Sequence, residues 1–258
     1  MLLAIDIGNT NTVLGVFTGP SLLRAWRLQT VRERTADEFG LLLDGLFAHD
    51  GIRRADVSGV VLGSVVPPVT STMAGMIFRD FNRMPLIVDP ARNSGMPTRY
   101  DNPAEVGADR IVNAIAAWEQ FGRTARCPLI VCDFGTATTL DAVSAAGEYL
   151  GGAICPGVNI SADALFQRAA RLPRIDVRKP AAVIGRTTVG AMESGLFYGY
   201  VGMVEGLVRR MRAELGGDVI CVATGGLAAV IAPETDLIQH VDIDLTLHGL
   251  RIVWERNQ

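Results

Sequence analysis

The sequence carries one short pattern twice, about half a chain length apart. The apolar runs Leu2–Ile7 and Leu129–Asp133 each reach an aspartate, Asp6 and Asp133, that stands two residues before a glycine. The two aspartates lie 127 positions apart in a chain of 258 residues. Short apolar runs that end at glycine indicate buried strands followed by tight turns. The spacing therefore predicts a duplicated unit, and this limits the possible folds more than any other feature of the chain.

The segments that follow each pattern also repeat. A predicted hairpin follows each first strand, and predicted helices and a further strand come next, Val57–Val66 in the first half and Val219–Ala223 in the second. Two acidic hairpins that each open a β-β-β-α-β-α unit resemble the duplicated actin-like (ribonuclease H-like) ATPase fold, in which the nucleotide lies between two domains. We therefore expect an α/β protein whose two domains each have a mixed five-stranded sheet flanked by helices.

The expected domain boundary lies near the middle of the chain. Residues 1–122 form the predicted N-terminal actin-like domain, with the first phosphate loop and a substrate loop. Residues 123–258 form the predicted C-terminal domain, with the second phosphate loop, an adenosine motif and helices suited to dimer formation.

Composition excludes several classes of protein. A net charge of −3 and a pI near 5.7 argue against a nucleic-acid-binding surface, which needs a concentrated basic face. Hydrophobic residues make up 49% and charged residues 20%, the balance of a globular enzyme. No apolar run is long enough for a membrane span, and Asp6 comes too early for a signal peptide. We expect a cytoplasmic protein that contacts neither membrane nor nucleic acid.

Lysine usage limits how the chain can hold a nucleotide. Lys179 is the only lysine, and it lies in Arg178-Lys179-Pro180, so the G-x-x-x-x-G-K-[ST] phosphate loop is absent. An ATP-binding site in this chain must therefore use backbone amides, metal ions and arginine.

The two acidic turns suit a polyphosphate. Gly8 and Gly135 allow tight turns in which consecutive N–H groups point at an anion. Asp6 and Asp133 would repel phosphate unless cations lie between them, so the pair implies magnesium near one and a second cation near the other. Each aspartate could instead serve only as a turn cap at the end of a strand. Further along, Ala223–Leu227 contains Gly225-Gly226, a plain turn by itself and a candidate adenosine site in a duplicated ATPase.

A candidate substrate segment lies between the repeats, at Tyr100–Arg110. Gly107 precedes a predicted helix, Gly107–Phe121, whose free N–H groups and dipole favour an anion. Asp109 and Arg110 fall in its first turn, where an acidic residue can also serve only as a partner of the helix dipole.

Five motifs in order resemble the type III pantothenate kinases, and the resemblance runs nearly end to end. They are D-I-G-N-T-N-T (Asp6–Thr12), Asp101-Asn102-Pro103 with Val106–Arg110, D-F-G-T-A-T-T-L-D (Asp133–Asp141), Gly151–Ile154 with Pro156-Gly157, and Ile184–Gly195 leading into Tyr198-Gly199. The resemblance implies ATP-dependent phosphorylation of the primary hydroxyl of pantothenate to 4'-phosphopantothenate, the first step of coenzyme A biosynthesis.

The resemblance also implies roles for individual residues. It makes Asp109 the catalytic base, Asp133 the ligand of a monovalent cation (potassium or ammonium), and Asp6 a magnesium ligand through water. The implied ATP-binding residues are Asp6, Ile7, Gly8, Asn9, Thr10, Asn11, Thr12, Val13 and Thr136. The implied pantothenate-binding residues are Tyr100, Gly107, Ala108, Asp109, Arg110 and Thr188.

Two other functions and one question of assembly stay open. Another small-molecule kinase on the same fold, such as a sugar or acetate kinase, would present similar loops. A non-catalytic ATP-binding transcriptional accessory protein of the same family would bind ATP without turnover. The apolar stripe of Val189–Leu215 fits a dimer interface and a buried face equally well, and the resemblance implies a homodimer.

Overall fold

The computed structural model describes residues 1–169 and 171–258. Contacts divide the chain into two compact units. The first comprises Met1–Met96, Asp101–Ala116 and Leu245–Gln258, and the second comprises Pro97–Tyr100 and Ala117–Asp244. The expected single boundary between residues 122 and 123 therefore differs from the units that contacts define, chiefly because the end of the chain packs with the first half.

The first unit is built on a five-stranded sheet in the order β3-β2-β1-β4-β5. Its strands are β1 (Leu2–Ile7), β2 (Asn11–Thr18), β3 (Ser21–Gln29), β4 (Gly59–Ser64) and β5 (Leu86–Ile87). The first three strands form an antiparallel meander, whereas β4 runs parallel to β1 and β5 runs parallel to β4. In this mixed sheet, β1 lies at the centre and is buried along nearly its whole length.

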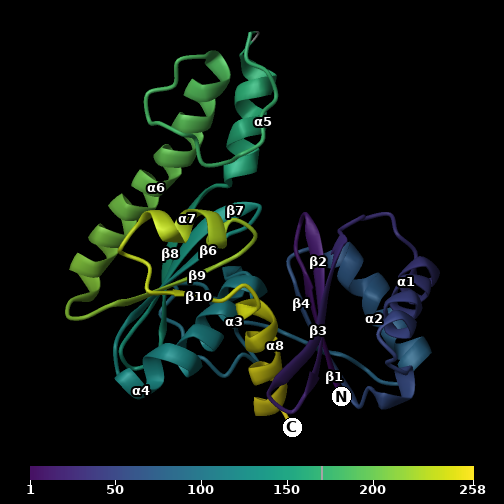
Figure 1. Ribbon diagram of the computed structural model, residues 1–258. Helices are drawn as coiled ribbons and strands as arrows, with labels where there is room; N and C mark the ends of the chain where they lie inside the picture. Colours follow the sequence, from purple (N-terminus) through teal and green to yellow (C-terminus); the bar gives the residue numbers. More distant parts are fainter. Residues whose placement is uncertain (170) are drawn as a thin grey trace. The chain divides into compact units, whose positions relative to one another are not determined.

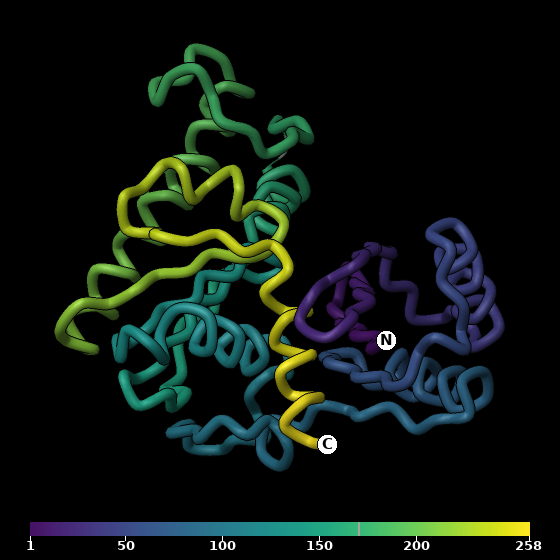
Figure 2. Tube along the Cα trace, turned by 60° about the horizontal axis from the view of Figure 1, so that its bottom comes forward, coloured from purple at the N-terminus to yellow at the C-terminus, as the bar shows by residue number. Residues whose placement is uncertain are grey.

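Helices cover both faces of this sheet. They are α1 (Ala36–His49), α2 (Pro67–Phe81), α3 (Ala108–Ala117) and α8 (Leu245–Arg256), with short 3₁₀ turns at Arg54–Asp56 and Pro103–Glu105. The apolar sides of α1 and α2 share one core with β1, β2 and β4. Helix α8 lies beside β1 in Figures 1 and 2, and a Cβ at Gly59 of β4 would collide with the Trp254 ring of α8. The glycine allows this close approach.

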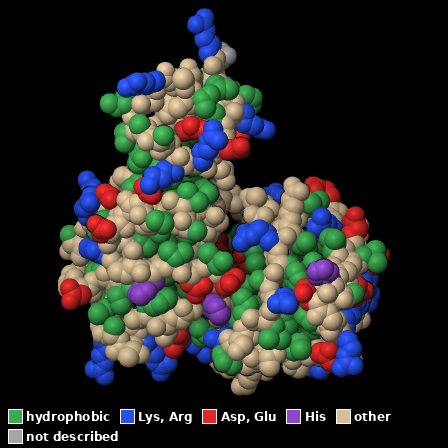
Figure 3. All heavy atoms as spheres, in the orientation of Figure 1, with side chains coloured by type: hydrophobic (Ala, Val, Ile, Leu, Met, Phe, Trp, Pro, Cys, Tyr) green, Lys and Arg blue, Asp and Glu red, His purple; other side chains and the backbone are tan. Residues whose placement is uncertain are grey.

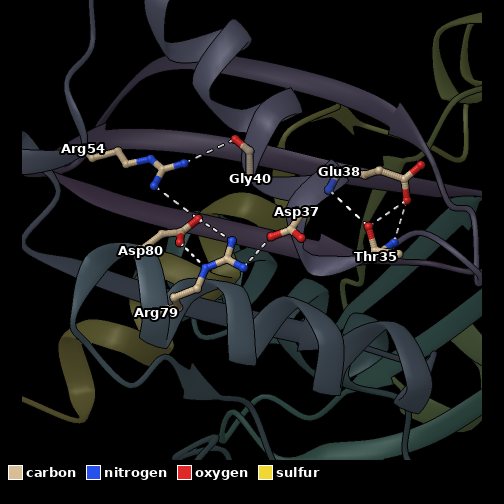
Figure 4. A network of polar contacts seen from close by, with 7 residues as sticks. All are labelled: Thr35, Asp37, Glu38, Gly40, Arg54, Arg79 and Asp80. Carbon is tan, nitrogen blue, oxygen red and sulfur yellow. Dashed lines mark hydrogen bonds and ion pairs between the residues drawn. The ribbon is translucent and has the colours of Figure 1, made fainter.

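A polar network joins α1 to α2 at the surface of the first unit (Figure 4). Arg79 of α2 contacts Asp37 of α1 at 2.6 Å and its neighbour Asp80 at 2.5 Å, and Arg54 contacts Asp80 at 3.2 Å. Thr35-Ala36-Asp37-Glu38 forms a capping box at the start of α1, in which the Thr35 hydroxyl accepts a hydrogen bond from the Glu38 N–H. These contacts fix how α1 begins and how it meets α2.

The second unit repeats the sheet of the first. Its order is β10-β9-β6-β7-β8. Counted from β8, the order β8-β7-β6-β9-β10 corresponds strand for strand to β3-β2-β1-β4-β5. The strands are β6 (Leu129–Phe134), β7 (Ala137–Val143), β8 (Tyr149–Pro156), β9 (Ile220–Thr224) and β10 (His240–Val241). Directions match too, since β6, β7 and β8 are antiparallel neighbours and β9 and β10 are parallel. The predicted duplication and the two mixed five-stranded sheets are confirmed.

The second unit adds its own helices to this sheet. They are α4 (Arg123–Ala125), α5 (Val158–Arg168), α6 (Thr188–Leu215) and α7 (Ala228–Ile231), with a π-helical turn at Trp118–Gly122 and a 3₁₀ turn at Ala232–Glu234. Buried residues of α5, α6 and α7 form one core with β6, β7 and β9. The helix predicted over Gly107–Phe121 is α-helical only to Ala117 and then widens into the π turn. Within the described residues, no helix is both long and apolar enough to span a membrane.

Candidate active site

The first acidic turn joins β1 to β2. Asp6 lies opposite Val13 and Ile7 opposite Thr12 in the antiparallel ladder. The Gly8 N–H donates a hydrogen bond to the Asn11 carbonyl at 3.0 Å, which closes the turn. Asn9 and Thr10 at its tip are exposed. The predicted ATP-binding residues of the first half thus form one hairpin turn whose tip is open to a ligand.

Asp109 and Arg110 lie in the first turn of α3. The helix starts at Ala108, and the Arg110 N–H donates a hydrogen bond to Asp109 Oδ1 at 2.8 Å. The aspartate therefore caps its own helix, and the Arg110 side chain is buried at 8% exposure. A Cβ at Gly107 would collide with the same Oδ1 atom, so glycine leaves the space that the carboxylate occupies.

Burial raises the pKa of Asp109 above the ordinary aspartate value of 3.8. Removal from water disfavours the ionised form. The Arg110 N–H and the Arg110 charge act in the opposite direction without cancelling the effect of burial. A carboxylate with a raised pKa is a better proton acceptor than an exposed one, which suits a general base.

Val65 links the start of α3 to the first turn. The Val65 N–H donates a hydrogen bond to the Ile7 carbonyl at 3.1 Å. A Cβ at Gly107 would lie 3.5 Å from Val65 Cγ1. Through this one residue, two predicted parts of the site, the ATP loop and the Asp109 segment, meet within the first unit.

The second acidic turn joins β6 to β7. Asp133 lies opposite Thr139 in the antiparallel ladder and beside Thr224 of the parallel neighbour β9. A Cβ at Gly225, where φ is +91°, would lie 2.5 Å from Asp133 Oδ1. A Cβ at Gly157 would collide with the Thr136 carbonyl. Gly225 and Gly157 thus allow β9 and α5 to approach the turn that carries Asp133 and Thr136.

This carboxylate suits a hard cation better than a transition metal. Oxygen ligands are those that magnesium and potassium accept, and magnesium usually takes only one or two carboxylates besides phosphate and water. Across residues 1–169 and 171–258, no group of three or more His, Cys, Asp or Glu residues could hold a metal ion by itself. Glycines at 135 and 225 allow the backbone to pack closely beside Asp133 Oδ1. The residues present therefore fit a cation that shares its coordination with a phosphate ligand.

Tyr100 belongs to the second unit, unlike the Asp109 segment. Main-chain hydrogen bonds of 2.8 Å from Tyr149 to Pro97 and from Arg99 to Tyr149 hold the preceding residues along the start of β8. The Tyr100 ring lies beside the Tyr149 ring, with centroids 6.2 Å apart. A Cβ at Gly151 would lie 3.3 Å from the Tyr100 ring. Tyr100 is thus held beside β8 by the main-chain bonds of the residues before it and by its own ring.

Thr188 begins α6 and lies on an apolar cavity. The preceding residue, Thr187, caps the helix by accepting a hydrogen bond from the Gly190 N–H at 3.0 Å. Thr188 is exposed, and it lines a cavity of about 500 Å³ together with Leu165 and Met192.

Several residues of the site escaped the sequence analysis. Val65 carries no motif, and its role depends on the approach of this residue, which follows β4, to Gly107, which precedes α3. Sequence spacing does not reveal this approach. Gly225, which the sequence predicts to be part of an adenosine motif, also lies against Asp133, a contact that the sequence does not predict. Gly157 was noted only as part of a family motif. Glycines beside strand ends were the one available signal.

Comparisons with known proteins agree on one family. The sequence model described as type III pantothenate kinase matches residues 2–210. A protein named type III pantothenate kinase from Moorella thermoacetica is 54% identical over 257 residues, covering 100% of both chains. Another of the same name from Myxococcus xanthus is 56% identical, covering 100% of this chain and 99% of its own.

Solved structures agree on the fold. A chain described as a Baf family transcriptional activator from Campylobacter jejuni superimposes with a TM-score of 0.61 at 19% identity, covering 99% and 98% of the two chains. The activator of 2-hydroxyisocaproyl-CoA dehydratase from Clostridium difficile superimposes with a TM-score of 0.57 at 13% identity, covering 99% and 95%. At these identities the likeness concerns architecture, and it agrees with the predicted actin-like ATPase fold.

Proposed function

Because the chain belongs to the type III pantothenate kinase family, we propose that it transfers the γ-phosphoryl group of ATP to the primary hydroxyl of pantothenate. The product is 4'-phosphopantothenate, and the reaction opens coenzyme A biosynthesis, in the cytoplasm. The one observation that carries this proposal is the contact of Val65 with both Ile7 and Gly107, which joins the phosphate loop to the segment of Asp109.

Asp109 is the general base of the proposed reaction. Its carboxylate accepts the proton of the pantothenate hydroxyl as that oxygen attacks the γ-phosphorus, a contribution of about 10²–10⁴-fold in rate. The raised pKa supports this role, and the helix start supplies N–H groups for an anionic substrate. Arg110 binds the pantothenate carboxylate with its planar guanidinium. Tyr100, Gly107, Ala108 and Thr188 complete the proposed pantothenate site.

The first hairpin turn holds the ATP phosphates in this proposal. Backbone N–H groups at the tip of the Asp6–Val13 hairpin, those of Asn9 and Asn11 among them, and the hydroxyl of Thr10 donate to phosphate oxygens, and Thr136 contributes from the second turn. Asp6 would hold magnesium through water. The cation supplies charge neutralisation, which is most of what phosphoryl transfer requires beyond positioning.

Asp133 is the proposed ligand of an activating potassium or ammonium ion. Its carboxylate at the end of β6 supports this assignment, since a monovalent cation binds oxygen ligands. Charge beside the phosphate tail would complement the negative charge of the transferred group.

A homodimer is the proposed assembly. Leu165 and Phe166 of α5 are 39% and 42% exposed. Figure 3 shows hydrophobic side chains interspersed with polar ones on this part of the surface of the second unit. Leu165 and Thr188 line the same cavity, so a second copy on this surface would also close the pantothenate site.

Turnover assays decide between this proposal and its alternatives. We expect ADP formation that depends on pantothenate, in potassium buffer with magnesium, and its near loss in Asp109→Asn. A sugar or acetate kinase would release ADP with another acceptor and none with pantothenate. A non-catalytic regulator would bind ATP and release no ADP with any acceptor, and either result would overturn the proposal.

A further inference from the structure

We propose that Thr30, which lies outside every recognised motif, is a positioning residue that fixes the first phosphate loop in its ATP-binding conformation. The inference rests on the proposed function only in taking Asp6–Val13 as the ATP loop. Thr30 directly follows β3, and its side chain is half-buried. It would contact no substrate, so any effect on ATP binding must pass through the loop.

Thr30 contacts the loop at three points. Its N–H donates to the Thr10 carbonyl at 2.9 Å, and its hydroxyl donates to the Gly8 carbonyl at 2.8 Å. A third contact of 2.9 Å joins the hydroxyls of Thr30 and Thr12. A hydroxyl carries one hydrogen, and that of Thr30 goes to Gly8, so Thr12 must be the donor in this third bond. The Thr12 side chain is fully buried, which gives this bond a defined geometry.

These bonds set the direction of two amides. A peptide unit is planar and trans, so its N–H points away from its C=O. Because the Gly8 carbonyl points toward Thr30, the Asn9 N–H of the same peptide unit points away from it. The Thr10 carbonyl also points toward Thr30, so the Asn11 N–H points away as well. One residue thereby orients two of the donors that an anion-binding turn offers.

The second hairpin is held differently. There the hydroxyl of Thr138, which occupies the position of Thr12, has no hydrogen-bond partner among the described residues. The backbone at Gly157 packs directly against the Thr136 carbonyl instead. The contacts that Thr30 makes with the loop therefore belong to the first hairpin alone among the described residues, and the duplicated fold does not require them.

The test replaces Thr30 by valine, which keeps the shape and removes the hydroxyl, and by serine, which restores it. We expect Thr30→Val to raise the KM for ATP roughly tenfold, the effect of one lost hydrogen bond at a binding loop, with the KM for pantothenate within about twofold. Thr30→Ser should bind ATP within about twofold of the wild type. Titration calorimetry with magnesium-ATP measures the same effect without turnover, so the result stands even if pantothenate is not the substrate.

Thr35→Ala is the matched control. Thr35 also bonds the main chain through one hydroxyl in the same unit, but only at the start of α1 (Figure 4). Its loss should lower the unfolding temperature and leave the ATP affinity unchanged. Thr30→Ala serves if the valine variant does not fold. An unchanged ATP affinity in the folded Thr30→Val or Thr30→Ala variant would overturn the inference. A loss of ATP affinity in Thr30→Ser as large as that in Thr30→Val would also overturn it.

Discussion

The Asp109 Oδ1 atom lies where a Cβ of residue 107 would stand, so the proposed base has room only because residue 107 is glycine. Gly107→Ala must therefore displace the carboxylate or the first turn of α3. Misplacement of a reacting group by about 1 Å can cost roughly 10²-fold in rate. We expect kcat with pantothenate to fall by about that factor, measured by coupled ADP release.

Gly75→Ala is the control for this substitution. Gly75 lies inside α2, and nothing would come within 4 Å of the added Cβ. Replacement of an unhindered helical glycine stabilises by about 0.4–1 kcal/mol. Gly75→Ala should keep wild-type kcat and unfold at a slightly higher temperature. If Gly107→Ala behaves in the same way, the proposed geometry of Asp109 is wrong.

The raised pKa of Asp109 predicts how activity depends on pH. A general base acts only when it is ionised. The rate kcat/KM should therefore fall as the pH decreases through the pKa of Asp109, at a pH above the ordinary aspartate value of 3.8. A pH-rate profile of the wild type would measure this limb. Asp109→Asn should retain little activity at any pH, and its residual rate should lack this limb.

The same pKa predicts the effect of Asp109 on stability. An acid whose pKa is raised by folding binds more protons in the folded state, so its contribution to stability is complete below pH 3.8 and is lost as the pH rises through the folded pKa. At neutral pH the buried charge is a cost. Asp109→Asn should thus be at least as stable as the wild type at pH 7.5, and its advantage should shrink toward pH 4. Thermal unfolding at several pH values measures this, and a variant less stable at pH 7.5 would contradict it.

Substitutions at Asp133 and at Gly225 should both impair the proposed monovalent cation site. Asp133→Asn removes the charge of the proposed ligand. Gly225→Ala places a Cβ 2.5 Å from the Asp133 Oδ1 atom, and it does so at a φ that alanine rarely adopts. The wild type should be active in potassium and nearly inactive in sodium, whereas both variants should be weakly active in either. Asp218→Asn, at an exposed carboxylate of the same unit, is the control and should keep the potassium response. A full potassium response in Asp133→Asn would remove that residue from the cation site.

The sequence predicts those parts of this molecule that local patterns encode. Each sheet begins with a strand that ends at an aspartate and a glycine, and this alone indicated the duplication. The capping box at Thr35 likewise depends on four consecutive residues. The packing of α8 on β1 depends instead on residues far apart in the chain, so its position with the first unit was missed. Val65 and Thr30 escaped for the same reason, because each contacts residues far away in the chain.

The apolar surface over α5 and α6 predicts the behaviour of the proposed dimer. Leu165 is 39% exposed and lines the same cavity as Thr188, so a charge there would be buried by a second copy. Burial of an unpaired carboxylate is strongly unfavourable. Leu165→Asp should therefore sediment as a monomer at concentrations where the wild type is a dimer.

Leu41 supplies the control for this last experiment. It is 73% exposed on α1, in the other unit, and Leu41→Asp should remain dimeric. If the partner closes the pantothenate site, Leu165→Asp should also raise the KM for pantothenate, while its ATP affinity by calorimetry stays near the wild-type value. A wild-type monomer in sedimentation equilibrium would refute the dimer outright. If Leu165→Asp stays dimeric, the two copies meet on another surface. The partner would then not cover the cavity beside Thr188.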